Sequence, residues 1–151
     1  RDLYEFRLLI EPQAAGWMAE YADAAEVAEL TALADRMGQL AEDDAALLDL
    51  MEADRIFHDL VSRASDNDVV AAVSRDIREV IGTLWGFSAM DATAVGHVAE
   101  QHQLIAAAVA QRDPQAAAES MRDHLLWAAR ADLHGLGEPF GLRLFTGTKT
   151  A

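Results

Sequence analysis

The chain has 151 residues, 52% of them hydrophobic, and a formal net charge of −14 at pH 7. This size and composition indicate one globular domain with a substantial core, and the acidic surplus excludes nucleic-acid binding by these residues, because affinity for phosphates comes from Lys and Arg. There is no cysteine, which excludes disulfides and thiolate ligands; we also find no membrane span and no signal peptide, and we expect a cytoplasmic protein.

Apolar residues at helical spacing predict six helices, over roughly 2–21, 23–37, 43–64, 69–87, 94–111 and 115–133. Pro12 should kink the first helix or mark a restart, Asp23 is a candidate N-cap of the second, and Gly38 should end or loosen that helix. The apolar stripes of the predicted helices include Leu9 in the first, Leu47 in the third, and Val73 and Val80 in the fourth.

Short connections between long amphipathic helices indicate antiparallel neighbours, so the sequence predicts an all-α antiparallel bundle. Beyond residue 134, several glycines and Pro139 predict an irregular, glycine-rich tail over 135–151, which leaves 1–134 as the folded domain. The chain begins at Arg1, without Met, and enters a helix at once. We therefore expect it to be part of a longer protein, with a partner domain upstream.

Asp54 and His58 form the first half of a candidate metal site. They are four residues apart on one predicted helix, so they differ by about 40° around its axis and lie one turn apart. Their neighbours place both beside the apolar face of that helix. Two side chains in this arrangement can reach the same ion.

His102 and His124 form the second half. The turn between the last two predicted helices centres on Asp113, eleven residues after His102 and eleven before His124. In an antiparallel hairpin such positions lie at the same depth, here about 16 Å from the turn. His97 projects about 140° away from His102, and His134 about 80° away from His124, so we expect both to be solvent-side residues.

Three imidazoles and one carboxylate suit a divalent transition metal, with zinc as the first choice and nickel, manganese or iron as alternatives. Two simpler explanations stay open on spacing alone. A lone histidine beside an apolar stripe is more often a core residue bonded to a carbonyl, and an Asp–His pair four residues apart is often only a surface hydrogen bond.

Five short segments occur together in an ordered pattern: YEFRLLIEP at 4–12, ADRIFH at 53–58, EQHQLI at 100–105, RDPQAA at 112–117 and MRDHL at 121–125. In this order they resemble the ligand-binding FCD domain of the FadR branch of GntR-type bacterial transcription regulators, over about residues 2–133. The resemblance implies six or seven antiparallel helices. It also matches the family's metal ligands, one by one, to Asp54, His58, His102 and His124.

The chain departs from the family in two places. The turn at 66–68 reads Asp-Asn-Asp where the family often has Gly-Asn-Pro, and the glycine-rich tail has no family counterpart. Neither change touches the four candidate ligands.

The resemblance further implies a homodimer, an upstream winged helix-turn-helix that binds operator DNA, and a small carboxylate effector held by Arg7. An ordinary ion pair with Glu11, four residues further on, would explain Arg7 equally well. Trp85 could line the effector pocket, although an aromatic residue at helical spacing is more often part of the core.

Our hypothesis is an allosteric sensor, in which a metal and Arg7 hold a small organic acid and the upstream domain reads DNA. The rival is a metal-dependent enzyme whose open site activates water. Glu52 and Asp59 flank the ligands but project about 100° or more away, so the sequence offers no clear general base. A third possibility is a dimerisation module in which the histidines are only structural.

Overall fold

A computed structural model describes residues 1–42, 47–85 and 92–135 of the protein. These residues contain six α-helices and no strand, which confirms the predicted all-α fold. The predicted tail at 135–151 lies outside the described residues, except for Gly135 at the end of the last helix. The helices are α1 (Asp2–Tyr21), α2 (Ala24–Leu40), α3 (Leu47–Arg63), α4 (Asp68–Trp85), α5 (Ala92–Ala110) and α6 (Pro114–Gly135).

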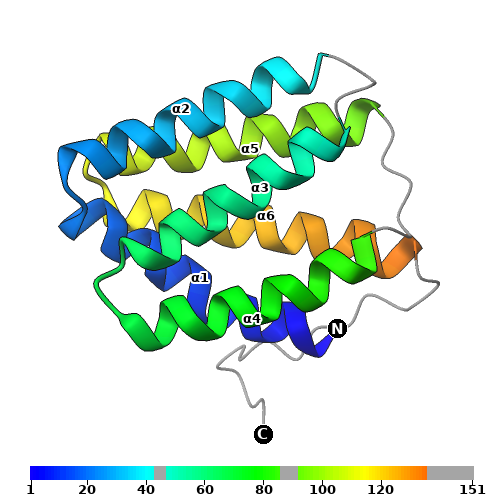
Figure 1. Ribbon diagram of the computed structural model, residues 1–151, viewed down its shortest axis with the longest axis horizontal. Helices are drawn as coiled ribbons and strands as arrows, with labels where there is room; N and C mark the ends of the chain where they lie inside the picture. Colours follow the sequence, from blue (N-terminus) through cyan, green and yellow to red (C-terminus); the bar gives the residue numbers. More distant parts are fainter. Residues whose placement is uncertain (43–46, 86–91, 136–151) are drawn as a thin grey trace, which may run out of the picture.

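The helices form one bundle in which α1 packs against α3, α4, α5 and α6. Figure 1 shows α2 beside α5, α6 across the middle, and α4 along one edge, where it packs on α3 and α1. The most extensive packing joins α1 to α6, and Gly16 permits it, since a Cβ there would lie 3.1 Å from the Pro114 carbonyl oxygen. The interior is filled by apolar side chains, including Leu8, Met18, Leu30, Phe57, Ile105, Met121 and Leu125.

Short-range signals fix the starts of α2 and α6. The Asp23 side chain accepts hydrogen bonds from the backbone N–H groups of Ala25 and Glu26, and the Glu26 carboxylate accepts one from the Asp23 N–H. This capping box confirms Asp23 as the N-cap. At the start of α6, the Asp113 carboxylate accepts from the Ala116 N–H, so the turn that sets the α5–α6 register is well defined.

Two helices continue past residues at which a break was one of the two predicted outcomes. α1 continues through Pro12, so the alternative of a restart is wrong, and the alternative of a kink stays a prediction. α2 continues past Gly38 to Leu40. Gly38 does not end the helix, and the nearest atom to a Cβ placed there is the side-chain nitrogen of Gln103 on α5, the movable end of an exposed side chain. No helix among the described residues is long and apolar enough to cross a membrane.

Some apolar residues predicted to face the core are exposed instead: Leu9, Leu47, Val73 and Val80. The buried face of α1 carries Arg7 and Glu11 between its apolar residues. Apolar periodicity cannot identify such a face, because two of its inward positions are charged and satisfied by each other.

Candidate metal centre

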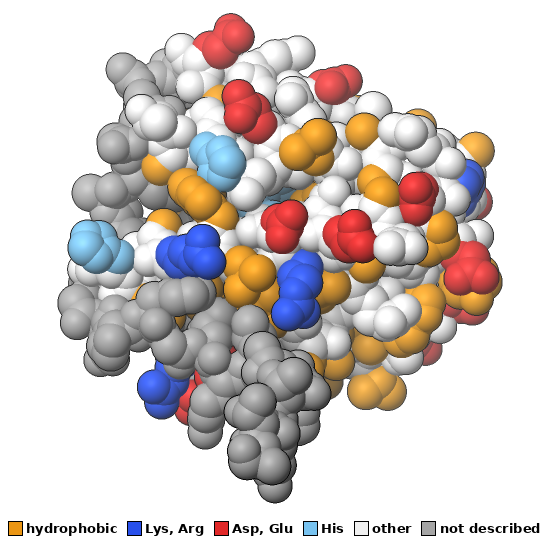
Figure 2. All heavy atoms as spheres, turned by 180° about the vertical axis from the view of Figure 1, so that it is seen from behind, with side chains coloured by type: hydrophobic (Ala, Val, Ile, Leu, Met, Phe, Trp, Pro, Cys, Tyr) orange, Lys and Arg blue, Asp and Glu red, His pale blue; other side chains and the backbone are white. Residues whose placement is uncertain are grey.

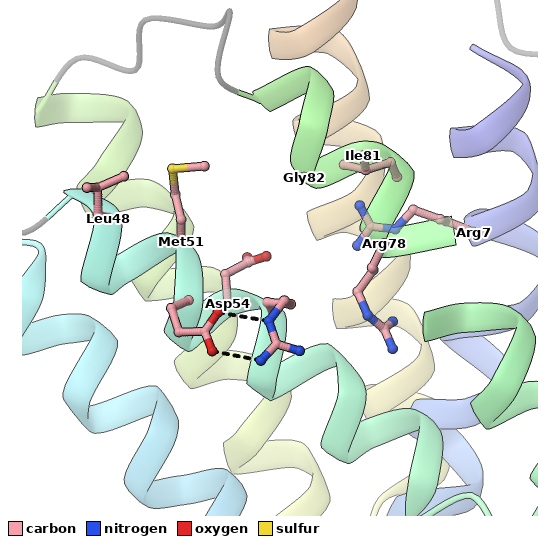
Figure 3. A pocket seen from close by; sticks show the side chains of 9 residues that line it. Arg7, Leu48, Met51, Asp54, Arg78, Ile81 and Gly82 are labelled. Carbon is pink, nitrogen blue, oxygen red and sulfur yellow. Dashed lines mark hydrogen bonds and ion pairs between the residues drawn. The ribbon is translucent and has the colours of Figure 1, made fainter. Parts of the chain in front are cut away.

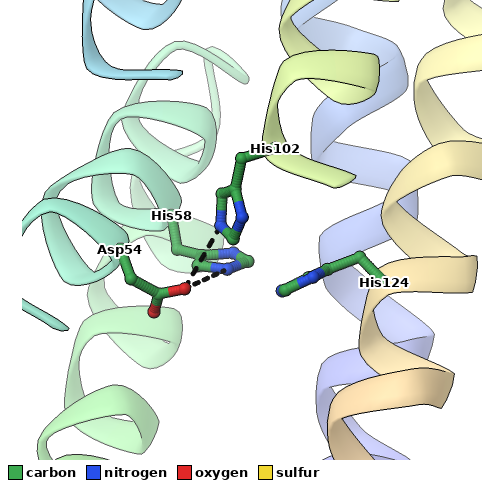
Figure 4. A group of neighbouring side chains, drawn as sticks. All are labelled: Asp54, His58, His102 and His124. Atoms are coloured by element: carbon green, nitrogen blue, oxygen red, sulfur yellow. Dashed lines mark ion pairs between the residues drawn. The ribbon is translucent and has the colours of Figure 1, made fainter. Parts of the chain in front are cut away.

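The structure brings the four predicted ligands together in the interior of the bundle. Asp54 and His58 come from α3, His102 from α5 and His124 from α6, and all four are buried. One potential ligand atom from each lies within 4.8 Å of the others (Figure 4). Three helices therefore converge on one point.

The equal spacing of His102 and His124 from the turn has the predicted consequence. Their rings meet with centroids 4.5 Å apart. The His58 ring approaches both, at 5.3 Å from His102 and 5.2 Å from His124. The three imidazoles are thus mutual neighbours, as ligands of a single ion must be.

Two of the imidazoles have their Nδ1 atoms committed to acceptors. His102 Nδ1 lies 2.8 Å from the Val98 carbonyl oxygen, and His124 Nδ1 lies 3.1 Å from the Gln101 Oε1 atom. Because neither oxygen carries a proton, each Nδ1 is the donor. In the neutral rings the lone pair is then on Nε2.

The His58 ring has the same orientation. Its Nδ1 lies 2.9 Å from Glu11 Oε2, an ion-pair contact without hydrogen-bond geometry, and its Nε2 lies 3.8 Å from Asp54 Oδ1. A carboxylate beside Nδ1 favours the proton on that nitrogen and the lone pair on the other. Such an outer partner is the usual way in which a metal-binding imidazole is oriented.

At the centre, acceptors face one another. Asp54 Oδ1 lies 3.2 Å from His102 Nε2, and neither atom has a hydrogen-bond partner among the described residues. Two buried acceptors at this distance need a shared cation, either a proton or a metal ion. A proton bridges only one pair, whereas four ligand atoms converge here. Three imidazole nitrogens and one carboxylate oxygen form a donor set that fits a divalent transition metal.

The electrostatics favour the protonation states that a metal requires. Burial by itself would raise the pKa of Asp54, but the neighbouring His58, His102 and His124 hold it below its usual range. Burial, together with His102 and His58, holds the pKa of His124 well below its usual range. At neutral pH the carboxylate is therefore charged and His124 is neutral, so no proton must leave either group before a metal binds.

Arg7 makes the predicted ion pair with Glu11 and also borders the candidate metal site. It donates from Nε to Glu11 Oε1 at 2.7 Å and from Nη2 to Glu11 Oε2 at 3.2 Å, which is the predicted ion pair. The same Nη2 lies 3.5 Å from His58 Nε2, so the guanidinium also borders the candidate metal site. Burial alone would raise the pKa of Glu11, but Arg7 and His58 hold it well below its usual range.

A cavity of about 220 Å³ opens beside this site between α1, α3 and α4 (Figure 3). Arg7 and Asp54 lie at its polar end together with Arg78. Apolar side chains cover another part of its wall. Its lining consists of Arg7, Leu48, Met51, Glu52, Asp54, Arg55, Arg78, Ile81 and Gly82.

Sequence reasoning missed three residues of the site: Glu11 as the partner of His58, Gln101 as the partner of His124, and Arg78 in the cavity wall. The four-residue spacing of Arg7 and Glu11 could have indicated Glu11. No spacing in the sequence indicates Gln101 or Arg78, because their partners come from other helices.

The remaining histidines and aromatic residues give mixed results. His134 is exposed, as predicted. His97 is half-buried, because its ring packs against the Trp127 ring with centroids 4.7 Å apart, so it is only partly the solvent-side residue predicted. The prediction for the Trp85 side chain lies outside the described residues.

Comparisons with known proteins concern the family and the fold of the chain. The family model described as the FCD domain matches residues 2–126. Comparison with curated proteins gives no match. Among solved structures, the chain is similar to a GntR protein of Streptococcus agalactiae, with a TM-score of 0.73 and 23% identity over 85% of this chain and 57% of that one.

Two further structures share the fold. The similarity to McbR/YncC of E. coli has a TM-score of 0.78 and 14% identity, and it covers 89% of this chain and 64% of that one. The metal-free FCD domain of TM0439 gives a TM-score of 0.72 and 18% identity, with 91% and 93% covered. The chain therefore spans less than two thirds of the first two proteins. At these identities the likeness shows the fold alone.

We expect the metal-free protein to lose stability as the pH falls from about 7.5 to 5. The native state keeps His124 neutral because burial lowers its pKa, whereas the unfolded chain binds a proton there below about pH 6.5. Protons thus favour the unfolded state, and at pH 5 the unfolding free energy should be lower by at most about 2 kcal/mol per such histidine. Urea unfolding in the presence of a chelator measures this.

Two variants serve as controls for this pH dependence. His124→Gln should weaken it, whereas His134→Gln, at an exposed position, should leave it unchanged. A stability that does not vary over this pH range would contradict a buried neutral His124.

Proposed function

Because this chain belongs to the FCD domain family, we propose that residues 1–134 form the effector-sensing and dimerisation domain of a metabolite-responsive, GntR-type transcription regulator of the FadR subfamily. The shorter length of the chain relative to the Streptococcus agalactiae GntR protein leaves room for a further domain. In this proposal that domain is an upstream winged helix-turn-helix, and the regulator is a cytoplasmic homodimer.

The proposed cofactor is a divalent transition metal held by Asp54, His58, His102 and His124, with zinc as the first choice and nickel, manganese or iron as alternatives. One observation carries this proposal: one potential ligand atom from each of four buried side chains lies close to the others, while Nδ1 of His102 and of His124 already has an acceptor and Nδ1 of His58 lies beside the Glu11 carboxylate. When bound, the metal would supply a Lewis-acid position for an oxygen of the effector.

The proposed effector is a small carboxylate that reaches Arg7 from the adjoining cavity. The Arg7 guanidinium is fixed by Glu11 and lies beside the metal-facing side of His58. A guanidinium held in this way is preorganised for a carboxylate. The cavity is smaller than most ligand pockets, which supports a small acid over a large cofactor.

Effector binding would act through α1, which carries Arg7 and packs on four other helices. An acid that binds one arrangement of the dimer better than the other would shift the spacing of the upstream domains on operator DNA. Those domains must supply the DNA-reading surface. The net charge of this chain is −14, and acidic side chains are spread over the face shown in Figure 2.

The rival function, a metal-dependent enzyme, has less support. FCD domains belong to regulators and not to enzymes. The two candidate bases are also engaged elsewhere, since Glu52 binds Arg55 and Asp59 binds Arg55 and Arg78. A dimerisation module without a ligand would leave the convergence of four buried acceptors unexplained.

We expect protein purified without a histidine tag to contain one equivalent of divalent metal, or to bind one equivalent of added zinc. Elemental analysis after dialysis measures it. His102→Ala should lose the metal because it removes one of four ligands, and His134→Ala is the matched control. Absence of stoichiometric metal in the wild type, also after addition of zinc or nickel, would refute the metal site.

Replacing Arg7 with Ala should weaken acid binding roughly 10- to 100-fold, the contribution of a charged hydrogen bond, without loss of metal. Isothermal titration of the zinc-loaded protein with small carboxylates measures the affinity. Because Arg7→Ala also leaves the buried Glu11 with fewer partners, Arg7→Lys is the second variant: it keeps the charge and loses the planar fork. Arg36→Lys, on the surface of α2, is the control.

An acid affinity that does not change in either Arg7 variant would remove Arg7 from the effector site.

A further inference from the structure

Arg78 is a buried cation that neither the metal site nor the proposed role of Arg7 uses. It projects from α4 into the wall of the cavity shown in Figure 3 and is 6% exposed. Its Nε donates to Asp59 Oδ1 at 3.0 Å, and its Nη2 is also bound to that oxygen. Its Nη1 has no hydrogen-bond partner among the described residues. A buried guanidinium N–H without an acceptor indicates a missing partner.

This N–H group lies close to the proposed effector site. Arg78 Nη1 lies 3.6 Å from Glu11 Oε1, the same oxygen that accepts from Arg7 Nε at 2.7 Å. Two guanidinium groups from different helices, α1 and α4, therefore meet at one end of the cavity. Asp54, the carboxylate of the candidate metal site, borders that end as well.

We propose that Arg78 binds a second acidic group of the effector, which makes the effector a small dicarboxylate. One carboxylate would occupy the end near Arg7 and the metal site, and the other would accept from Arg78 Nη1. The short carbon chain between them would contact the apolar part of the wall at Met51 and Ile81. The cavity volume of about 220 Å³ suits an acid of about this size. This inference rests on the proposed acid-sensing function.

The test uses two pairs of acids that differ only in the second carboxylate: succinate with butyrate, and malate with 2-hydroxybutyrate. Each acid is titrated calorimetrically into the zinc-loaded protein. We expect the dicarboxylate of at least one pair to bind about tenfold or more tightly than its partner, because it gains a charged hydrogen bond.

Arg78→Gln should reduce that preference to about one while the monocarboxylate still binds, because the remaining carboxylate keeps its contacts with Arg7. Arg75→Gln is the matched control: it lies on the same helix, and its side chain is 61% exposed. If Arg78→Gln does not fold, Arg78→Lys keeps the charge but loses the fork, and it should show a reduced preference.

Two results would overturn the assignment of Arg78: equal affinity for both members of each pair in the wild type, or a preference that persists in the Arg78 variant. A variant that weakens both members of a pair equally would also overturn it, since Arg78 would then only support the structure. Binding without a charge preference would leave the proposed acid sensor intact. If no acid binds the zinc-loaded protein, the effector proposal fails, and this inference fails with it.

Discussion

The interior of this bundle is organised around acceptors that face one another. Nδ1 of His102 and Nδ1 of His124 donate away from the centre, to Val98 and Gln101, and Nδ1 of His58 lies beside the Glu11 carboxylate. At the centre, Asp54 Oδ1 and His102 Nε2 face each other without a hydrogen-bond partner among the described residues. Buried acceptors that face each other without a donor are unfavourable unless a cation binds between them. Because the four candidate ligands come from α3, α5 and α6, a metal ion there would also fasten three helices together, and its binding would add to the stability of the fold.

Glu11 links this centre to the effector cavity. Its carboxylate holds Arg7, lies beside His58 Nδ1 and is within reach of Arg78. A change in the position of Arg7 would therefore alter the surroundings of His58 in the metal site and of Arg78 on α4. This arrangement offers a physical route by which acid binding and metal binding influence each other, and by which both influence α1.

Much of the fold and the four-residue cluster could be predicted from the sequence, because each depended on local spacing. A four-residue separation placed Asp54 and His58 on one helix face, and equal distances from Asp113 placed His102 and His124 at the same level. The supporting residues could not be predicted in this way. Gln101 and Arg78 find their partners on other helices, and the burial of Glu11 follows from helix packing. For the same reason, the exposed apolar residues of α1 and α4 were wrongly assigned to the core.

A metal site of this kind requires three imidazoles that present Nε2 to one point while their Nδ1 atoms carry protons. Long-range proton–nitrogen correlation spectra of the histidine side chains test this requirement directly, first in the metal-free protein and then during zinc addition. We expect the Nδ1-protonated form for His58, His102 and His124 at neutral pH, and a zinc-induced shift of all three Nε2 resonances at one equivalent, with His134 unchanged. Protons on Nε2 in these residues, or Nε2 resonances that do not respond to zinc, would contradict the proposed metal site.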